Sequence, residues 1–143
     1  MIVKSVIAGE YTAPPAHGPY ITEICGITPD ELTFHYLRGG IFESFIISEI
    51  KKMLFNHRIP AEVSFFRDST GNEVDLILEM EGVTKAIEIK SGKTIAPQFF
   101  KGIHFWNKLT ENDQSFVIYA GDDIQLRSDV TVLNWRVTER VII

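Results

Sequence analysis

The sequence predicts an α/β domain in which a mixed central sheet is flanked by helices. Two long stretches carry apolar residues at helical spacing, and five shorter stretches have the apolar or alternating character of strands. Along the chain the order is one helix, three strands, a second helix and two further strands. This order is typical of an α/β sandwich with a mixed sheet.

The long helices and the strands follow directly from these patterns. A helix is expected over Ile41 to Phe55 and another over Ile95 to Leu109, where Pro97 falls in the first turn and is tolerated. The expected strands are Ala61 to Arg67, Glu73 to Met80, Val83 to Lys90, Ser115 to Ala120 and Val130 to Trp135.

The N-terminal region has a different composition. Three prolines and a glycine lie between Tyr11 and Tyr20, which prevents a continuous helix or a central strand. We therefore expect residues 1–20 to form an arm or linker, with an edge strand at Ile2 to Ile7, and residues 21–143 to form the domain. A short helix is expected to begin at Thr28 and to end near Gly39-Gly40.

Composition limits the class of protein. The 143 residues are 45% hydrophobic and 23% charged, which are values of a globular domain. The single cysteine excludes an internal disulfide and fits a reducing cytosol, and no apolar run approaches the about 20 residues that span a bilayer. A cytoplasmic protein without a membrane partner is expected. The net charge of −5 disfavours duplex binding through overall charge.

Acidic residues meet in one predicted hairpin. A two-residue turn at Glu81-Gly82 would place Asp75 opposite Glu88, with the β-carbons of the two residues about 4.5–5.5 Å apart. Like charges in such a pair are destabilising, and alternation adds Lys90 to the same face. The opposite face is then the predicted core face, with Val74, Leu76, Leu78, Ile87 and Ile89.

Two interpretations of this hairpin remain open at the level of the residues. Asp75 and Glu88 would suit a hard divalent cation such as Mg²⁺, with Lys90 placed to hold or deprotonate a water molecule. Alternatively, the hairpin lies on the surface and Glu73 forms a cross-strand salt bridge with Lys90. A register shift of one residue would move every side chain to the other face.

Glu43 is the other unusual carboxylate. Helical spacing places it on the same face as Ile46, Ile50 and Leu54, where an unpaired charge is costly. The simpler interpretation is a position in the first helical turn, where the helix dipole favours a carboxylate.

These residues resemble a known signature. Asp75, twelve intervening residues and then Glu88-Ile89-Lys90 are similar to the D…ExK pattern of the restriction-endonuclease-like PD-(D/E)xK superfamily, with Val74 in place of its proline. Residues 37–43, 66–75 and 87–91 together resemble the C-terminal domain of unknown function that follows the ATPase module in many prokaryotic AAA-type ATPases. The resemblance runs from Ile21 to Trp135.

The resemblance implies a restriction-endonuclease-like core and a set of roles. Asp75 and Glu88 would ligate Mg²⁺ or Mn²⁺, Lys90 would serve the attacking water, and Glu43 would be a supporting carboxylate. The implied function is a Mg²⁺-dependent nuclease that hydrolyses nucleic-acid phosphodiesters, with DNA as the expected partner. The alternative is a catalytically silent module that mediates protein contacts or regulation for an ATPase. The choice between DNA and RNA and the oligomeric state stay open.

Overall fold

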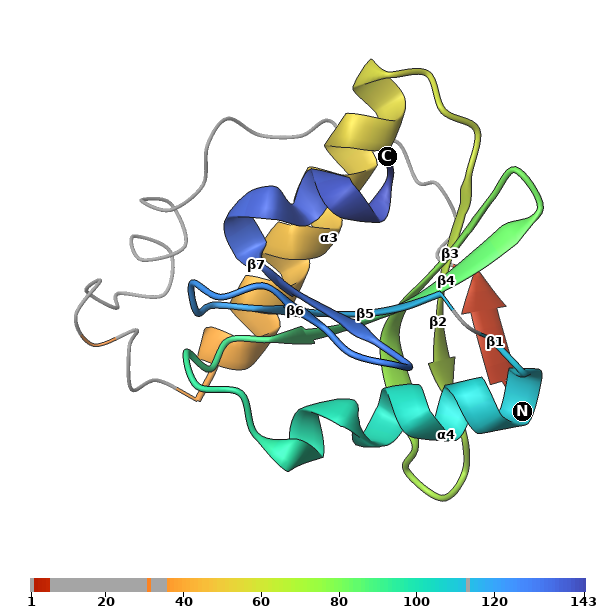
Figure 1. Ribbon diagram of the computed structural model, residues 1–143. Coiled ribbons are helices and arrows are strands. Elements are labelled where there is room, and N and C mark those ends of the chain that lie inside the picture. The colour runs from red at the N-terminus through yellow and green to blue at the C-terminus, as the bar shows by residue number, and fades with distance from the viewer. Residues whose placement is uncertain (1, 6–30, 32–35, 113) are drawn as a thin grey trace.

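A seven-stranded mixed sheet forms the centre of the fold (Figure 1). The computed structural model of the chain describes residues 2–5, 31, 36–112 and 114–143. The strand order is β1-β2-β3-β4-β5-β7-β6. The strands are β1 (Ile2–Ser5), β2 (Glu62–Arg67), β3 (Glu73–Met80), β4 (Val83–Lys90), β5 (Ser115–Tyr119), β6 (Gln125–Leu126) and β7 (Thr131–Asn134). The prediction of an α/β domain with a mixed sheet is confirmed.

Helices cover both faces of this sheet (Figure 1). The α-helices are α3 (Arg38–Asn56) and α4 (Lys101–Thr110), and the 3₁₀ segments are η1 (Pro97–Phe100) and η2 (Trp135–Val141). Helix α3 and η2 pack on one face, where Ile46, Ile50 and Leu54 are buried. Helix α4 follows η1 across the opposite face, where it buries Ile103 and Trp106. The sheet therefore has a hydrophobic core on each side.

Strand direction changes at β4. Strands β1 to β4 pair antiparallel, whereas β4 pairs parallel with β5, and β5 pairs parallel with β7. The β3–β4 turn has positive φ at both central residues, 53° at Glu81 and 78° at Gly82, as a tight two-residue hairpin turn requires. The predicted register is confirmed, since Leu76 pairs with Ile87.

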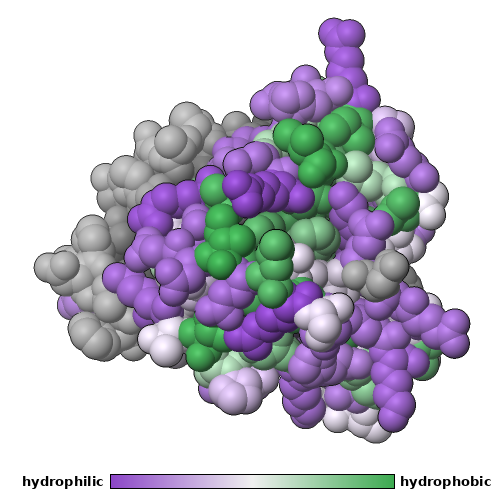
Figure 2. Space-filling model, viewed as in Figure 1, coloured by the Kyte–Doolittle hydropathy of each residue, from purple (hydrophilic) through white to green (hydrophobic). Residues whose placement is uncertain are grey.

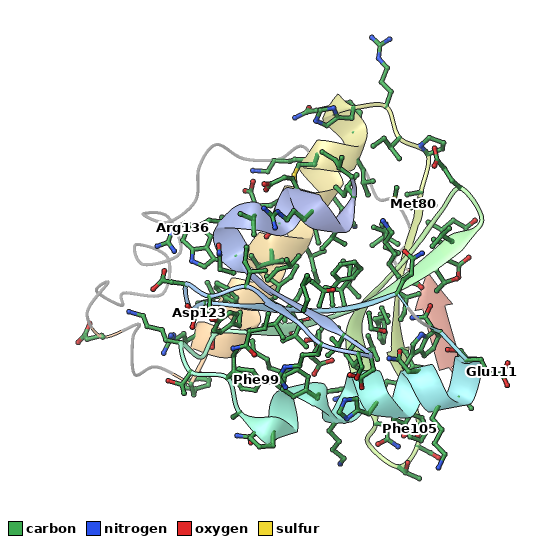
Figure 3. All side chains as sticks on the ribbon, in the orientation of Figure 1. Met80, Phe99, Phe105, Glu111, Asp123 and Arg136 are labelled. Atoms are coloured by element: carbon green, nitrogen blue, oxygen red, sulfur yellow. The ribbon has the colours of Figure 1, made fainter. Side chains whose placement is uncertain are left out.

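The element boundaries differ from the prediction most clearly at the two long helices. Helix α3 begins at Arg38, so Gly39 and Gly40 lie in its first turn rather than at the end of an earlier helix. The second predicted helix is divided, because the chain forms the 3₁₀ segment η1 from Pro97 before α4 begins. Figure 3 labels Phe99, which lies in η1, and Glu111, which directly follows α4, so the two residues lie near the two ends of the η1–α4 segment. The short strand β6 and the segment η2 were not predicted.

Some predictions concern the N-terminal residues. Strand β1 pairs with β2 at the edge of the sheet, within the range expected for an edge strand. The boundary expected between residues 20 and 21 lies outside the described residues, as does the expected start of the short helix at Thr28. Within the described part of the chain, no helix combines the length and the apolar character that a membrane crossing requires.

Candidate active site

A β-bulge in β3 places Asp75. Between two regular pairs of the β2–β3 ladder, the single residue Phe65 is opposed by both Asp75 and Leu76. The extra residue shifts the alternation by one, so Val74 belongs to the core on the α4 side whereas Leu76 belongs to the core on the α3 side. The prediction that Val74 shares a face with Leu76 is therefore wrong. The bulge leaves Asp75 at the point where regular pairing of β3 with β4 ends.

The Asp75 carboxylate takes over a bond of the β3–β4 ladder. The last regular pair at this end joins Leu76 and Ile87. One residue further, Asp75 Oδ2 accepts a hydrogen bond of 2.7 Å from the backbone N–H of Ile89. The Asp75 side chain is only 10% exposed. This carboxylate is thus fixed by the backbone of β4, which also carries the other charged residues of the site.

Lys90 joins the two carboxylates. Its Nζ lies 2.5 Å from Glu88 Oε1 and 3.5 Å from Asp75 Oδ2. Since both oxygens are this close to one nitrogen atom, they are at most about 6 Å from each other. The Glu88 side chain is only 6% exposed. We call Asp75, Glu88 and Lys90 the carboxylate–lysine cluster.

The predicted core face was also incomplete, because the face that carries Glu88 is buried as well. Helix α4 covers this face, on which Ile77 and Ala86 of the same hairpin are also buried. The alternative of a surface hairpin with a Glu73–Lys90 salt bridge does not occur. Glu73 pairs instead with Arg67 at 2.9 Å, and Lys90 pairs within the cluster.

One oxygen of Glu88 has no hydrogen-bond partner among the described residues. Oε2 is buried, and it accepts no hydrogen bond from any described residue. It lies beside Gly102 of α4, since a Cβ atom on residue 102 would be 3.2 Å from Oε2 and 2.0 Å from the carbonyl oxygen of Glu73. Only glycine therefore lets α4 approach the two strands this closely. Sequence analysis missed Gly102, although a glycine within a helical pattern is a signal for such close packing.

Helix α3 brings Glu43 to the edge of the cluster. The helix begins at Arg38, whose guanidinium donates a hydrogen bond to the carbonyl oxygen of Ser91 just after β4. Glu43 is half-buried and lies in the second turn, so the interpretation as a first-turn carboxylate is wrong. Burial raises the pKa of Glu43, and the charge of Asp75 raises it further.

Electrostatics within the cluster favour a protonated carboxyl. Burial and the nearby charge of Asp75 raise the pKa of Glu88 to about 7. Burial also raises the pKa of Asp75, despite the opposing effect of Lys90. Burial lowers the pKa of Lys90, but Asp75 and Glu88 outweigh it, so the net shift is upward. At neutral pH the lysine is charged while Glu88 is partly protonated.

Fold and site together define an α/β domain whose mixed sheet carries a largely buried carboxylate–lysine cluster beside α4. Residues 38–137 match the family described as Domain of unknown function (DUF4143). Because the match covers well over half of the sequence, the chain belongs to this family. It begins at the first residue of α3 and ends within η2, so it includes every residue of the cluster. No curated protein and no solved structure matched the chain.

Proposed function

We propose that this domain hydrolyses phosphodiester bonds of nucleic acid, with DNA as the first substrate to test, and that it uses Mg²⁺ or Mn²⁺. The observation that carries the proposal is the pair of buried carboxylates that share one lysine, with Glu88 Oε2 left without a partner among the described residues. A buried, uncompensated carboxylate oxygen is costly for folding. Such groups are concentrated at functional sites.

The donor atoms suit a hard divalent cation. Asp75 and Glu88 offer carboxylate oxygens, and Mg²⁺ commonly binds to one or two carboxylates while substrate phosphate and water complete its shell. The described residues contain no group of three or more His, Cys, Asp or Glu side chains placed to hold a metal ion. A metal ion held by Asp75 and Glu88 would therefore need further ligands from water or from the substrate.

Each residue of the site then has a role. When bound, the ion would supply a Lewis acid and a more acidic water molecule. Asp75 and Glu88 would hold it, and the Ile89 N–H bond would keep Asp75 in place. The ammonium group of Lys90 would hold the attacking water or a phosphate oxygen through charge-assisted hydrogen bonds. Glu43 would support the site from α3.

The order of elements supports the same proposal. Helix α3 precedes the antiparallel strands β2, β3 and β4, and a crossover through α4 leads to the parallel strand β5. This order is the one expected for a restriction-endonuclease-like core, and Asp75, Glu88 and Lys90 are the residues that resemble the D…ExK signature.

A second candidate is a catalytically silent module that binds an ATPase or another protein. It is favoured by the net charge of −5, which is unusual for a protein that binds phosphates. Large apolar side chains are also exposed, among them Phe55 at 84% and Leu126 at 83%. Figure 2 shows apolar atoms toward the middle of one face, with hydrophilic atoms around them. Contacts with another protein would cover such side chains.

A nicking assay distinguishes the two candidates. Wild-type protein is incubated with supercoiled plasmid and, separately, with labelled RNA, each with Mg²⁺, Mn²⁺ or EDTA. We expect metal-dependent nicking by wild type and none by Lys90→Ala. The matched control is Lys85→Met, because Lys85 lies on the same strand but donates to the carbonyl oxygen of Val141, away from the cluster. Cleavage by Lys90→Ala at the wild-type rate, or no cleavage by wild type with any metal, would contradict the nuclease proposal.

A further inference from the structure

We propose that Lys90 is the resident counter-ion of the Asp75–Glu88 pair, and that a divalent cation has to displace its ammonium group in order to bind. This inference rests on the proposed metal site and adds a property that catalysis alone does not require. Lys90 would then restrain metal binding in the free protein, in addition to its role toward the substrate.

The geometry of the ammonium group carries the inference. Lys90 Nζ is within 2.5 Å of Glu88 Oε1 and 3.5 Å of Asp75 Oδ2, so it contacts both of the proposed metal ligands. Its side chain is only 28% exposed. Asp75 Oδ2 additionally accepts the Ile89 N–H. One oxygen of each carboxylate is thus already occupied by donors from the protein itself.

A divalent ion and this ammonium group cannot both be close to the same oxygens without strong repulsion. Metal–oxygen bonds for Mg²⁺ and Ca²⁺ are about 2.0–2.6 Å long, so an ion bound to the two oxygens that Nζ contacts, Glu88 Oε1 and Asp75 Oδ2, would lie near the present position of Nζ. Two positive charges at that separation repel each other, and the partly buried environment weakens screening. Because the lysine is part of the chain, its effective concentration at the carboxylates is high. Removal of the ammonium group should therefore strengthen metal binding.

Calorimetric titration with Mn²⁺ as the only added metal tests the inference. We expect Lys90→Met to bind Mn²⁺ at least about fivefold more tightly than wild type, the lower end of typical coupling between two interacting sites. Mn²⁺ should also raise the melting temperature of Lys90→Met by more than that of wild type, since metal replaces the missing counter-ion. Lys85→Met is the matched control, and its Mn²⁺ affinity should equal that of wild type. Lys90→Met should at the same time fail to nick DNA.

The possible outcomes separate this inference from the proposed function. If wild type and Lys90→Met bind Mn²⁺ with equal affinity, the inference is overturned and the metal site stays intact. A lower affinity in Lys90→Met would also overturn it. Absence of Mn²⁺ binding in all variants would overturn the metal site and the inference together. Where Lys90→Met does not fold without metal, Lys90→Gln, which keeps a polar side chain of similar reach, gives the same comparison.

Discussion

Glu88→Gln provides a sharp test of the electrostatics of the cluster, because it removes one buried charge with little change in volume. Burial and the charge of Asp75 raise the pKa of Glu88 from 4.5 to about 7 in the folded protein. The stability that depends on this group is therefore fully present below pH 4.5 and is lost as the pH rises through about 7. Each unit of pKa difference corresponds to about 1.4 kcal/mol, so complete ionisation costs about 3 kcal/mol.

The expected signal is a change of stability with pH that the variant lacks. As the pH rises from about 5.5 to about 8, ionisation of Glu88 should lower the unfolding free energy of wild type by about 2 kcal/mol. Glu88→Gln should not show this loss. Urea unfolding in EDTA, followed by circular dichroism at both pH values, measures this difference. Glu79→Gln, at an exposed position of β3, is the control and should stay within about 0.5 kcal/mol of wild type.

Two results would refute this reasoning. The first is a difference between Glu88→Gln and wild type that is the same at both pH values. The second is a variant that is less stable than wild type at about pH 8. The first result would mean that the pKa of Glu88 is not raised toward 7. The second would mean that the Lys90 ion pair outweighs the desolvation of Glu88, and that this carboxylate stabilises the fold.

Three further predictions concern the same hairpin and its surroundings. Asp75→Asn keeps an oxygen acceptor for the Ile89 N–H, so thermal melts in chelator should show a gain of about 0.2–1 kcal/mol, and Mn²⁺ should no longer raise the melting temperature; a loss of stability would favour a structural salt bridge. Gly102→Ala should lower the unfolding free energy measured in urea by more than about 2 kcal/mol, because its Cβ would collide with a backbone carbonyl. In Gly39→Ala the Cβ meets nothing within 4 Å, so this variant should stabilise α3 by about 0.5–1 kcal/mol. Unfolding free energies that change alike in the two variants would contradict the close approach of α4. Glu81→Asn should raise the unfolding free energy by about 0.5 kcal/mol, because residue 81 has a positive φ of 53° and asparagine adopts positive φ more readily than glutamate. An unchanged melting temperature would argue against strain at this residue.

Local patterns were sufficient to predict the hairpin, because its register depends on its own turn. Glu81-Gly82 sets the pairing of Leu76 with Ile87, and this pairing is independent of any other element. The proximity of Asp75 to Glu88 followed from the same register.

Features that depend on distant elements could not be predicted in this way. The bulge at Asp75 appears only when β3 is paired with β2, and it is the reason that Val74 faces α4. The burial of Glu88 requires α4 to lie against the strands, which depends on Gly102 far along the chain. The burial of Oε2 without a hydrogen-bond partner in the described part of the chain is likewise a result of tertiary packing and has no local signal.

The hairpin that carries the cluster also has consequences for how the chain folds. Asp75, Glu88 and Lys90 all lie on β3 and β4, which are joined by a two-residue turn, so their contacts are close in sequence. Local hairpin contacts can form within about 1–10 μs, whereas the parallel pairing of β4 with β5 requires closure of a much longer loop. We therefore expect Lys90 to meet the two carboxylates while the hairpin is still in water, and α4 to cover Glu88 afterwards. In this order the acidic pair would already hold a counter-charge when water leaves it.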